Sequence, residues 1–238
     1  MILLALETSS GLESAALLDD RTVLASASWA ATREHARLFF DALRQLLAEQ
    51  ALTPDRVDAF AVGLGPGSFT GLRMALSAAQ GLALPGNKPL FGLPSAEAAA
   101  AEAARETGRS RILVCGDGRR QRIWSGLFEK RGELFELAED WHLDPISELT
   151  GRLPGGGALC TADWDALAAP LREAAAGKNV RLLERPLFPS AQTLGRLAFE
   201  RLSRGQPSQP LSPIYLHPPV FIPPSFPVEE DEPLKESP

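Results

Sequence analysis

The chain has 238 residues, a length that suits one large domain or two small ones and is enough to bury a core. Its formal net charge of -6 argues against autonomous, high-affinity nucleic-acid binding, because the averaged field repels phosphate. The apolar N-terminal run lacks a basic flank and breaks at Glu7, so it reads as neither a signal peptide nor a membrane span. We therefore expect a cytoplasmic protein with no membrane partner.

Cysteine and histidine usage gives no metal or redox motif. Cys115 and Cys160 lie far apart in apolar contexts, which is typical of reduced core thiols. His35, His142 and His217 fall in unrelated contexts, without a cysteine or acidic partner at ligand spacing. The sequence therefore predicts no metal site and no cofactor.

Hydrophobic periodicity predicts alternating strands and helices in the first half of the chain. The expected elements are strands at 2–7, 14–20 and 22–28, a helix at 33–50, a strand at 58–63, a helix at 70–84, a strand at 89–92 and a helix at 96–107. Ser95 is the expected N-cap of the last helix, and Gly108 is its expected C-terminal stop.

A shift of 110 residues lays the start of the second half on that of the first. Residues 2–5 fall on residues 112–115, and Glu7 falls on Asp117. Each half therefore opens with a strand that ends in an acid, followed by two more strands. This is the plan of each lobe of the duplicated ribonuclease H-like fold of actin, heat-shock chaperones and sugar kinases. The sequence predicts an α/β, actin-like (ASKHA) fold with two lobes, each a mixed sheet flanked by helices.

The end of the chain changes character at Gly205. Before it, residues 189–205 predict a last helix with Ser190 near its cap. From Gly205 onward, the last 34 residues hold ten of the 20 prolines, which favours an extended segment with a disordered acidic end. Apolar groups at 214–216 and 220–222 are expected to strap this tail to the body. The expected division is an N-terminal lobe at 1–108 with dimerisation helices, a C-terminal lobe at 109–205 whose last helix returns to the first lobe, and a tail at 206–238.

Four glycines between Gly63 and Gly71 precede the second helix. No lysine stands where a Walker loop needs one, and Ser68 stands where a GxGxxG motif needs its third glycine. We interpret the segment as a structural turn built around Pro66, with Ser68 or Thr70 as the helix cap. A phosphate-binding turn is the alternative.

The two strand-end acids, Glu7 and Asp117, mark a candidate nucleotide cleft, with Thr8 beside the first. An actin-like ATPase would use such acids around Mg²⁺, so a small ATP-dependent kinase or ATPase is the alternative function. Thr8 rather than a glycine follows Glu7. Gly118 does follow Asp117, but Arg119, Arg120 and Arg122 crowd the rest of that loop, so neither loop suits close approach of phosphate. We therefore favour structural polar residues and assign no confident cofactor-binding residue. The sequence leaves open whether tRNA contacts these arginines, which are Arg119, Arg120 and Arg122.

Four collinear segments resemble the TsaB (YeaZ) family: LALETS at 4–9, REHARLFFDALRQLL at 33–47, DAFAVGLGPGSFTGLRMALSAAQGLAL at 58–84 and PLFGLPSAEAAA at 89–100. The likeness weakens beyond Thr150. It implies a non-catalytic paralogue and activating partner of TsaD in threonylcarbamoylation of the tRNA adenosine next to the anticodon. It also implies a heterodimer with a TsaD-like protein, a TsaE-like ATPase joined through the complex, a homodimer when alone, and only indirect contact with tRNA.

Segment 95–103 lacks the histidines of the HxxxH metal motif of TsaD-like proteins, and the chain has no peptidase motif. We therefore expect no catalytic residue. The resemblance implies that the helices at 33–50 and 70–84 dock on the partner. The expected interface residues are Phe39, Leu43, Phe69, Leu72, Ala75, Leu76 and Ala79. Ordinary intrachain core is the alternative for each of them, and a self-contained homodimeric binding module is a third possible function.

Overall fold

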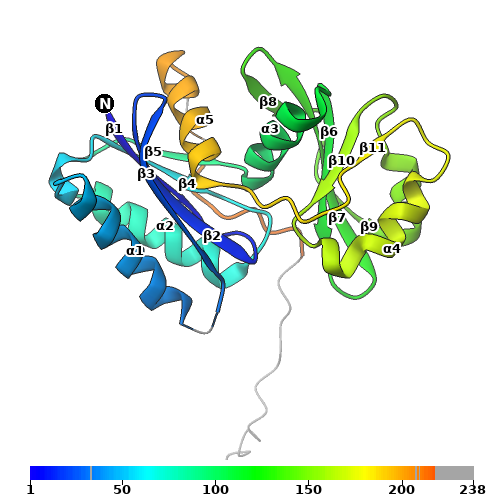
Figure 1. The fold of residues 1–238 in the computed structure, drawn as a ribbon, viewed down its shortest axis with the longest axis horizontal. Coiled ribbons are helices and arrows are strands. Elements are labelled where there is room, and N and C mark those ends of the chain that lie inside the picture. The colour runs from blue at the N-terminus through cyan, green and yellow to red at the C-terminus, as the bar shows by residue number, and fades with distance from the viewer. Residues whose placement is uncertain (33, 207, 209, 218–238) are drawn as a thin grey trace, which may run out of the picture.

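The computed structural model describes residues 1–32, 34–206, 208 and 210–217 (Figure 1). The acidic end of the chain and the strap expected at 220–222 lie outside the described residues. Two lobes stand side by side, the first in blue and cyan and the second in green and yellow (Figure 1). Within the described residues, no helix is long and apolar enough to cross a membrane.

The first lobe is built on a five-stranded mixed sheet. Its strands are β1 (Ile2–Glu7), β2 (Leu12–Asp19), β3 (Thr22–Ala30), β4 (Ala59–Gly63) and β5 (Leu90–Leu93). They lie in the order β3-β2-β1-β4-β5, in which the first three are antiparallel neighbours and β4 and β5 run parallel to β1.

The second lobe repeats this path. Its strands are β6 (Arg111–Asp117), β7 (Arg122–Arg131), β8 (Leu134–Leu137), β9 (His142–Pro145), β10 (Ala158–Thr161) and β11 (Arg181–Leu182). The sheet order is β11-β10-β6-β7-β8, and β9 also pairs with β7. In each sheet the first strand of the lobe, β1 or β6, lies in the middle. The second and third strands continue the sheet on one side through antiparallel pairs, and the strands on the other side run parallel to the first. The predicted two-lobed α/β fold is therefore confirmed.

Alternation along the strands gives each sheet two buried faces. In β1, Leu4 and Leu6 face a core shared with α1 (His35–Glu49) and α2 (Phe69–Ala83). Leu3 and Ala5 point to the opposite face, which α5 (Ala191–Ser203) covers. The near-continuous apolar run of β1 follows from this burial on both sides.

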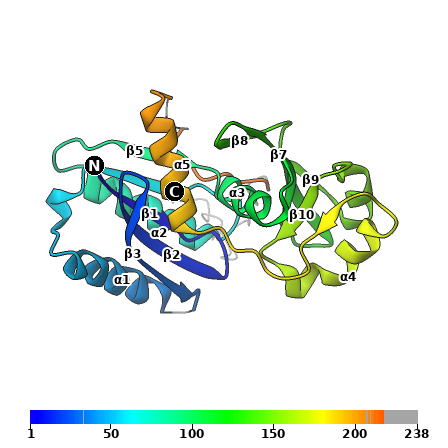
Figure 2. The same ribbon diagram turned by 45° about the horizontal axis from the view of Figure 1, so that its top comes forward.

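The last helix of each half packs on the other half (Figures 1 and 2). α3 (Ser95–Thr107) leaves the first lobe and covers one face of the second sheet, whose other face is covered by α4 (Trp164–Ala175). α5 leaves the second lobe and lies on β1 and β2 of the first. Glu97 of α3 and Arg201 of α5, both largely buried, form an ion pair of 2.8 Å where these helices cross. Each lobe therefore needs the other half of the chain to close its core.

Two short 3₁₀ helices, η1 (Pro54–Arg56) and η2 (Ile146–Arg152), complete the elements. The prediction that Ser95 caps α3 is wrong, because Pro94 is the N-cap. The Ser95 hydroxyl instead accepts a hydrogen bond from the Gly65 N–H at 3.0 Å. Gly108 ends α3 in the left-handed region at φ 70°, as expected from the sequence. Ser190 caps α5 by accepting from the Thr193 N–H. Hydrophobic periodicity did not predict α4.

After α5 the chain returns across the first lobe to the second. The Ile214 N–H donates to the Leu64 carbonyl at 2.8 Å, and the Tyr215 ring lies 5.5 Å from that of Phe69. His217 Nε2 lies 2.7 Å from the Gly118 carbonyl of the second lobe. We call residues 210–217 the strap. It is the orange-red segment that ends between the lobes (Figure 1).

Candidate functional site

The glycine-rich loop between β4 and α2 packs on the backbone that follows β1. A Cβ added at Gly67 would lie 2.0 Å from the Ser9 carbonyl oxygen, and one at Gly71 would lie 2.1 Å from that of Thr8. The Ser68 N–H donates to the Ser9 carbonyl at 2.8 Å, and Thr8 Oγ1 donates to the Gly71 carbonyl at 2.8 Å. The glycines thus permit two backbones to touch, which a phosphate group between them would prevent.

The Ser68 side chain completes this turn. Its hydroxyl accepts a hydrogen bond from the Gly71 N–H at 3.2 Å and caps α2. Gly65, at φ 90°, occupies the left-handed region that favours glycine, and Pro66 follows it. These contacts agree with a structural turn. In this arrangement the N–H groups of Gly65, Ser68 and Gly71 donate to groups of the chain itself.

Glu7, the last residue of β1, is completely buried. Its Oε1 accepts a hydrogen bond from the Ser9 N–H at 2.8 Å, while Oε2 has no hydrogen-bond partner among the described residues. Gly63 leaves the room that Oε2 occupies, since a Cβ there would lie 2.0 Å from that atom. Burial raises the pKa of Glu7 above its ordinary value, against the opposing effect of the nearby Ser9 and Ser95 hydroxyls. The carboxyl is sealed inside the first lobe.

Asp117 stands at the matching end of β6 and is held by its own loop. Its carboxylate accepts from the Arg119 N–H at 2.8 Å and forms an ion pair with the Arg119 guanidinium at 3.0 Å. Its own N–H donates to Asp163 Oδ2 at 2.8 Å. Arg119, Arg120 and Gln121 all have positive φ, from 51° to 60°, so three side chains crowd a turn where glycine would be relaxed.

The two strand-end acids are therefore in unlike surroundings, one sealed and one paired with its neighbour. Thr8, the third candidate residue of the cleft, is likewise buried and bonded to Gly71. Across the described ranges, no group of three or more His, Cys, Asp or Glu side chains is placed to hold a metal ion. Cys115 and Cys160 are buried and free, and burial raises the pKa of both thiols.

The two helices expected to dock on a partner lie together on one face of the first sheet. Six of the seven expected interface residues are buried in the core beneath these helices: Phe39, Leu43, Leu72, Ala75, Leu76 and Ala79. The intrachain-core alternative holds for these six. Phe69 is the exception, with 54% of its surface exposed. A partner contact on these helices would have to use their outward positions.

The outward positions combine aromatic and small side chains. On α1, Phe40 is 56% exposed and contacts Phe39 edge to face, with ring centroids 5.1 Å apart. On α2, the Arg73 guanidinium lies 3.8 Å from the centroid of the exposed Phe69 ring. Ser77, one turn beyond Arg73, is exposed as well. The signal for Phe40 was present in the sequence, because Arg37 and Arg44 share its helical face at spacings of three and four residues.

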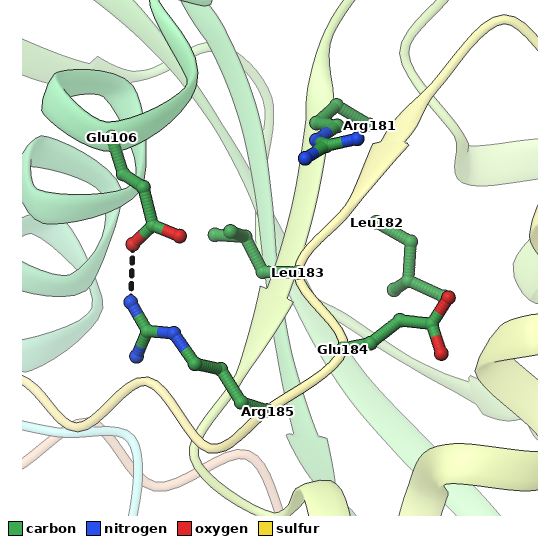
Figure 3. Close-up of a pocket in the computed structure, with 6 residues that line it drawn as sticks. All are labelled: Glu106, Arg181, Leu182, Leu183, Glu184 and Arg185. Carbon is green, nitrogen blue, oxygen red and sulfur yellow. Dashed lines mark hydrogen bonds and ion pairs between the residues drawn. The ribbon is translucent and has the colours of Figure 1, made fainter.

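A shallow hollow of about 260 Å³ lies where the end of α3 faces the chain after β11. Its charged side chains mostly neutralise one another, as the contact between Glu106 and Arg185 in Figure 3 shows. Glu184 forms a further ion pair with Arg172 at 2.7 Å. The matched charges give this hollow no preference for a charged ligand.

A family model and curated relatives of this chain point to the same family. The model of the family "TsaD: tRNA N6-adenosine threonylcarbamoyltransferase" matches residues 29–198. The chain is 32% identical over 130 residues to the tRNA threonylcarbamoyladenosine biosynthesis protein TsaB of Escherichia coli, covering 55% of this chain and 56% of that one. The Bacillus subtilis TsaB protein is 30% identical over 136 residues, covering 57% and 58%. The chain thus spans a little over half the length of these curated relatives.

Solved structures extend the likeness over most of the chain. A Pseudomonas aeruginosa protein described as similar to peptidase YEAZ is 28% identical, with a TM-score of 0.78 and coverage of 91% of this chain and 99% of that one. YeaZ from the same organism is 27% identical, with a TM-score of 0.75 and coverage of 90% and 100%. Because the family model covers well over half of the sequence and these structures share its fold, the chain belongs to the TsaD family and, within it, to the TsaB (YeaZ) proteins.

Proposed function

We propose that this chain is a non-catalytic, activating partner of a TsaD-like enzyme in the biosynthesis of tRNA threonylcarbamoyladenosine. The TsaB relatives are named for that pathway. The chain also resembles a tRNA N6-adenosine threonylcarbamoyltransferase of Fervidobacterium nodosum, at 33% identity over 108 residues. In this role, the enzyme transfers the threonylcarbamoyl group to the adenosine beside the anticodon while this chain holds it in an active arrangement.

The burial of Glu7 is the observation that best supports a non-catalytic role for this chain. A carboxylate that serves Mg²⁺ or a nucleotide has to face the cleft, and oxygen ligands have to reach the ion. Here the carboxyl lies beneath Gly63 and Ser95, and the loop that would cradle phosphate is packed on Thr8 and Ser9. These contacts support the proposal that the candidate nucleotide cleft is part of the packed core and does not bind a nucleotide. The same reasoning weighs against an ATP-dependent kinase.

The outward face of α1 and α2 supplies the proposed docking surface. We define it as Phe40, Phe69, Arg73, Ser77 and Gly81. Aromatic and arginine side chains are the usual anchors of protein interfaces. A Cβ added at Gly81 would meet nothing within 4 Å, so this part of α2 lies open to the approach of another helix. In the proposed cytoplasmic complex a TsaD-like paralogue covers this face, a TsaE-like ATPase joins through the complex, and tRNA contacts this chain only indirectly. A second copy of this chain occupies the face when the paralogue is missing.

Reconstitution tests the proposal. A TsaD-like enzyme and a TsaE-like ATPase are supplied with threonylcarbamoyl-adenylate and tRNA, with and without this chain, and modified adenosine is measured. The expected result is product only when this chain is present and none from this chain alone. Asp117→Asn should activate as well as the natural chain, because the proposal gives that carboxylate no chemistry. ATP turnover by the isolated chain that disappears in Asp117→Asn would overturn the proposal in favour of an ATPase.

A further inference from the structure

A second hollow, of about 380 Å³, lies at the crossing of the two exchanged helices. Its walls come from the C-terminal half of α3, the turn between β7 and β8, and α5. Figure 1 shows α5 and the β8 hairpin rising on the same side of the molecule, one on each lobe. The hollow is distant from the candidate nucleotide cleft along α3, since Glu7 lies near Ser95 at the start of that helix and the hollow borders Gly108 at its end.

The inner part of the hollow is apolar. Ala104, Phe135 and Leu197 line it, and each is largely buried. They come from α3, β8 and α5, so three elements of both halves meet there. An apolar floor with a few charged groups above it is the usual composition of a small-ligand site, and the volume falls in the range of such sites.

The rim carries four cationic side chains, Arg105, Arg109, Lys130 and Arg196, and one carboxylate among the described residues, Glu133. The chain as a whole has 30 acidic and 24 basic residues, so its composition alone would not gather four cations on one hollow. Three of them, Arg105, Arg109 and Lys130, have no side-chain hydrogen bond or ion pair within the part of the chain that the structure describes. The N–H donors of these three side chains are therefore available to an anion.

A helix dipole accounts for part of this charge. Arg105 lies in the last turn of α3, where a cation is favourable beside the unpaired carbonyls. Lys130 comes from β7 and Arg196 from the middle of α5, so neither lies at the end of a helix. The convergence of cations from three elements therefore needs a second cause.

We propose that this hollow binds a small phosphorylated ligand that carries an apolar or aromatic group, of about the size of a nucleoside monophosphate. Arginine guanidinium groups match phosphate oxygens in geometry and charge, and lysine adds a further donor. The floor made by Ala104, Phe135 and Leu197 takes the ring. The volume of about 380 Å³ and the net charge of -6 favour a small ligand over an extended RNA backbone. This site is independent of the proposed partner surface and of the candidate nucleotide cleft.

Isothermal titration calorimetry on the full chain tests the site with three probes: AMP, ribose 5-phosphate and a tRNA anticodon stem-loop. The expected result is binding of AMP, with ribose 5-phosphate binding more weakly because it lacks the ring. Arg105→Gln and Lys130→Gln should each weaken AMP binding by about tenfold or more, since each removes a charge-assisted hydrogen bond. Arg44→Gln is the matched control, because it removes the same charge from an exposed helix far from the hollow, and it should leave AMP binding unchanged.

Circular dichroism melts of the three variants show whether the fold survives, as it should for exposed side chains. Absence of AMP binding to the natural chain would overturn the proposal, and so would AMP binding that Arg105→Gln and Lys130→Gln leave unchanged. Binding of the RNA alone, weakened by the same two variants, would also overturn it and assign the cations to an RNA backbone. None of these results bears on activation of a TsaD-like enzyme, so the two proposals fail separately.

Discussion

Single residues decide what the candidate nucleotide cleft can do. The sequence marked Glu7 as a candidate cleft residue, but in the structure Ser9 and Ser95 lie beside its carboxyl and Gly63 leaves the room that it occupies. The sequence alone predicted that Glu7 ends a strand. Because no glycine follows Glu7, the sequence also argued against a role for this carboxylate at a metal ion. It could not show complete burial, because burial depends on Ser95, which comes from a helix much later in the chain.

Glu7→Gln should make folding stability less dependent on pH. Burial raises the folded-state pKa of this carboxyl above the unfolded value, so the stability that its protonated state contributes is lost as pH rises through the folded pKa. The natural chain is therefore destabilised at neutral and alkaline pH by a buried charge that the glutamine variant does not carry. Thermal melts at pH 5 and pH 8 should show a smaller difference for Glu7→Gln than for the natural chain, with exposed Glu49→Gln as control. An equal pH dependence in all three would contradict the buried, raised-pKa carboxyl.

Two glycines of α2 should respond in opposite ways to alanine. Gly71→Ala places a methyl group 2.1 Å from the Thr8 carbonyl oxygen and should destabilise the fold by about 3 kcal/mol or more. Gly81→Ala meets open space in the same helix and should stabilise it by about 1 kcal/mol. Urea denaturation of both variants measures the difference. A mild effect of Gly71→Ala would mean that the loop does not pack on the backbone that follows β1.

Among the elements, the positions of the first three helices in the sequence were predicted better than which side of each helix is buried. Periodicity placed α2 within one residue of its observed start and end, because its apolar pattern is local. It could not tell which side of a helix with so many apolar and small residues faces the sheet, and six expected interface residues proved to be core. It also missed α4, which contains Pro170, and the pairing of α3 with α5, which is set by contacts between distant segments.

Arg201→Leu tests the pairing of the exchanged helices. The change leaves the Glu97 carboxyl buried without its guanidinium partner and should destabilise the fold by about 3 to 5 kcal/mol. Burial already raises the pKa of Glu97, so the acid should protonate more readily in the variant. The double variant Glu97→Leu, Arg201→Leu should recover most of the loss, because no unpaired charge remains. Chemical denaturation of the three proteins measures this, and a neutral Arg201→Leu would show that the ion pair does not tie α3 to α5.

In the whole molecule, the sequence predicted the duplication of the two halves. It predicted only part of the way in which the halves are joined. Each half opens with a strand, an acid and two further strands, and both sheets have the same order. The strap joins the lobes differently, through Ile214 on Leu64 and His217 on Gly118. Its proline content predicted an extended chain but not its path, because proline sets local backbone angles and not tertiary contacts.

Truncation measures what the strap contributes. A chain ending at Gly205 loses the Ile214 hydrogen bond, the stacking of Tyr215 on Phe69 and the contact of His217 with Gly118. It should melt about 5 °C below a chain ending at His217, which keeps all three. Small-angle scattering of the same two proteins should show a larger radius for the shorter one if the strap holds the lobes together. Equal melting temperatures would contradict a stabilising strap.

We propose that the outward face of α1 and α2 docks a TsaD-like paralogue, and two charges placed on opposite sides of α2 separate that face from the core. Ser77→Glu stays in water until a partner covers it, so the monomer should fold normally. Ala75→Glu enters the core and should unfold the chain. Calorimetric titration of the folded Ser77→Glu chain into the TsaD-like protein is the decisive measurement. We expect an unchanged melt with affinity reduced at least a hundredfold, whereas a Ser77→Glu chain that binds as tightly as the natural one would place the partner elsewhere.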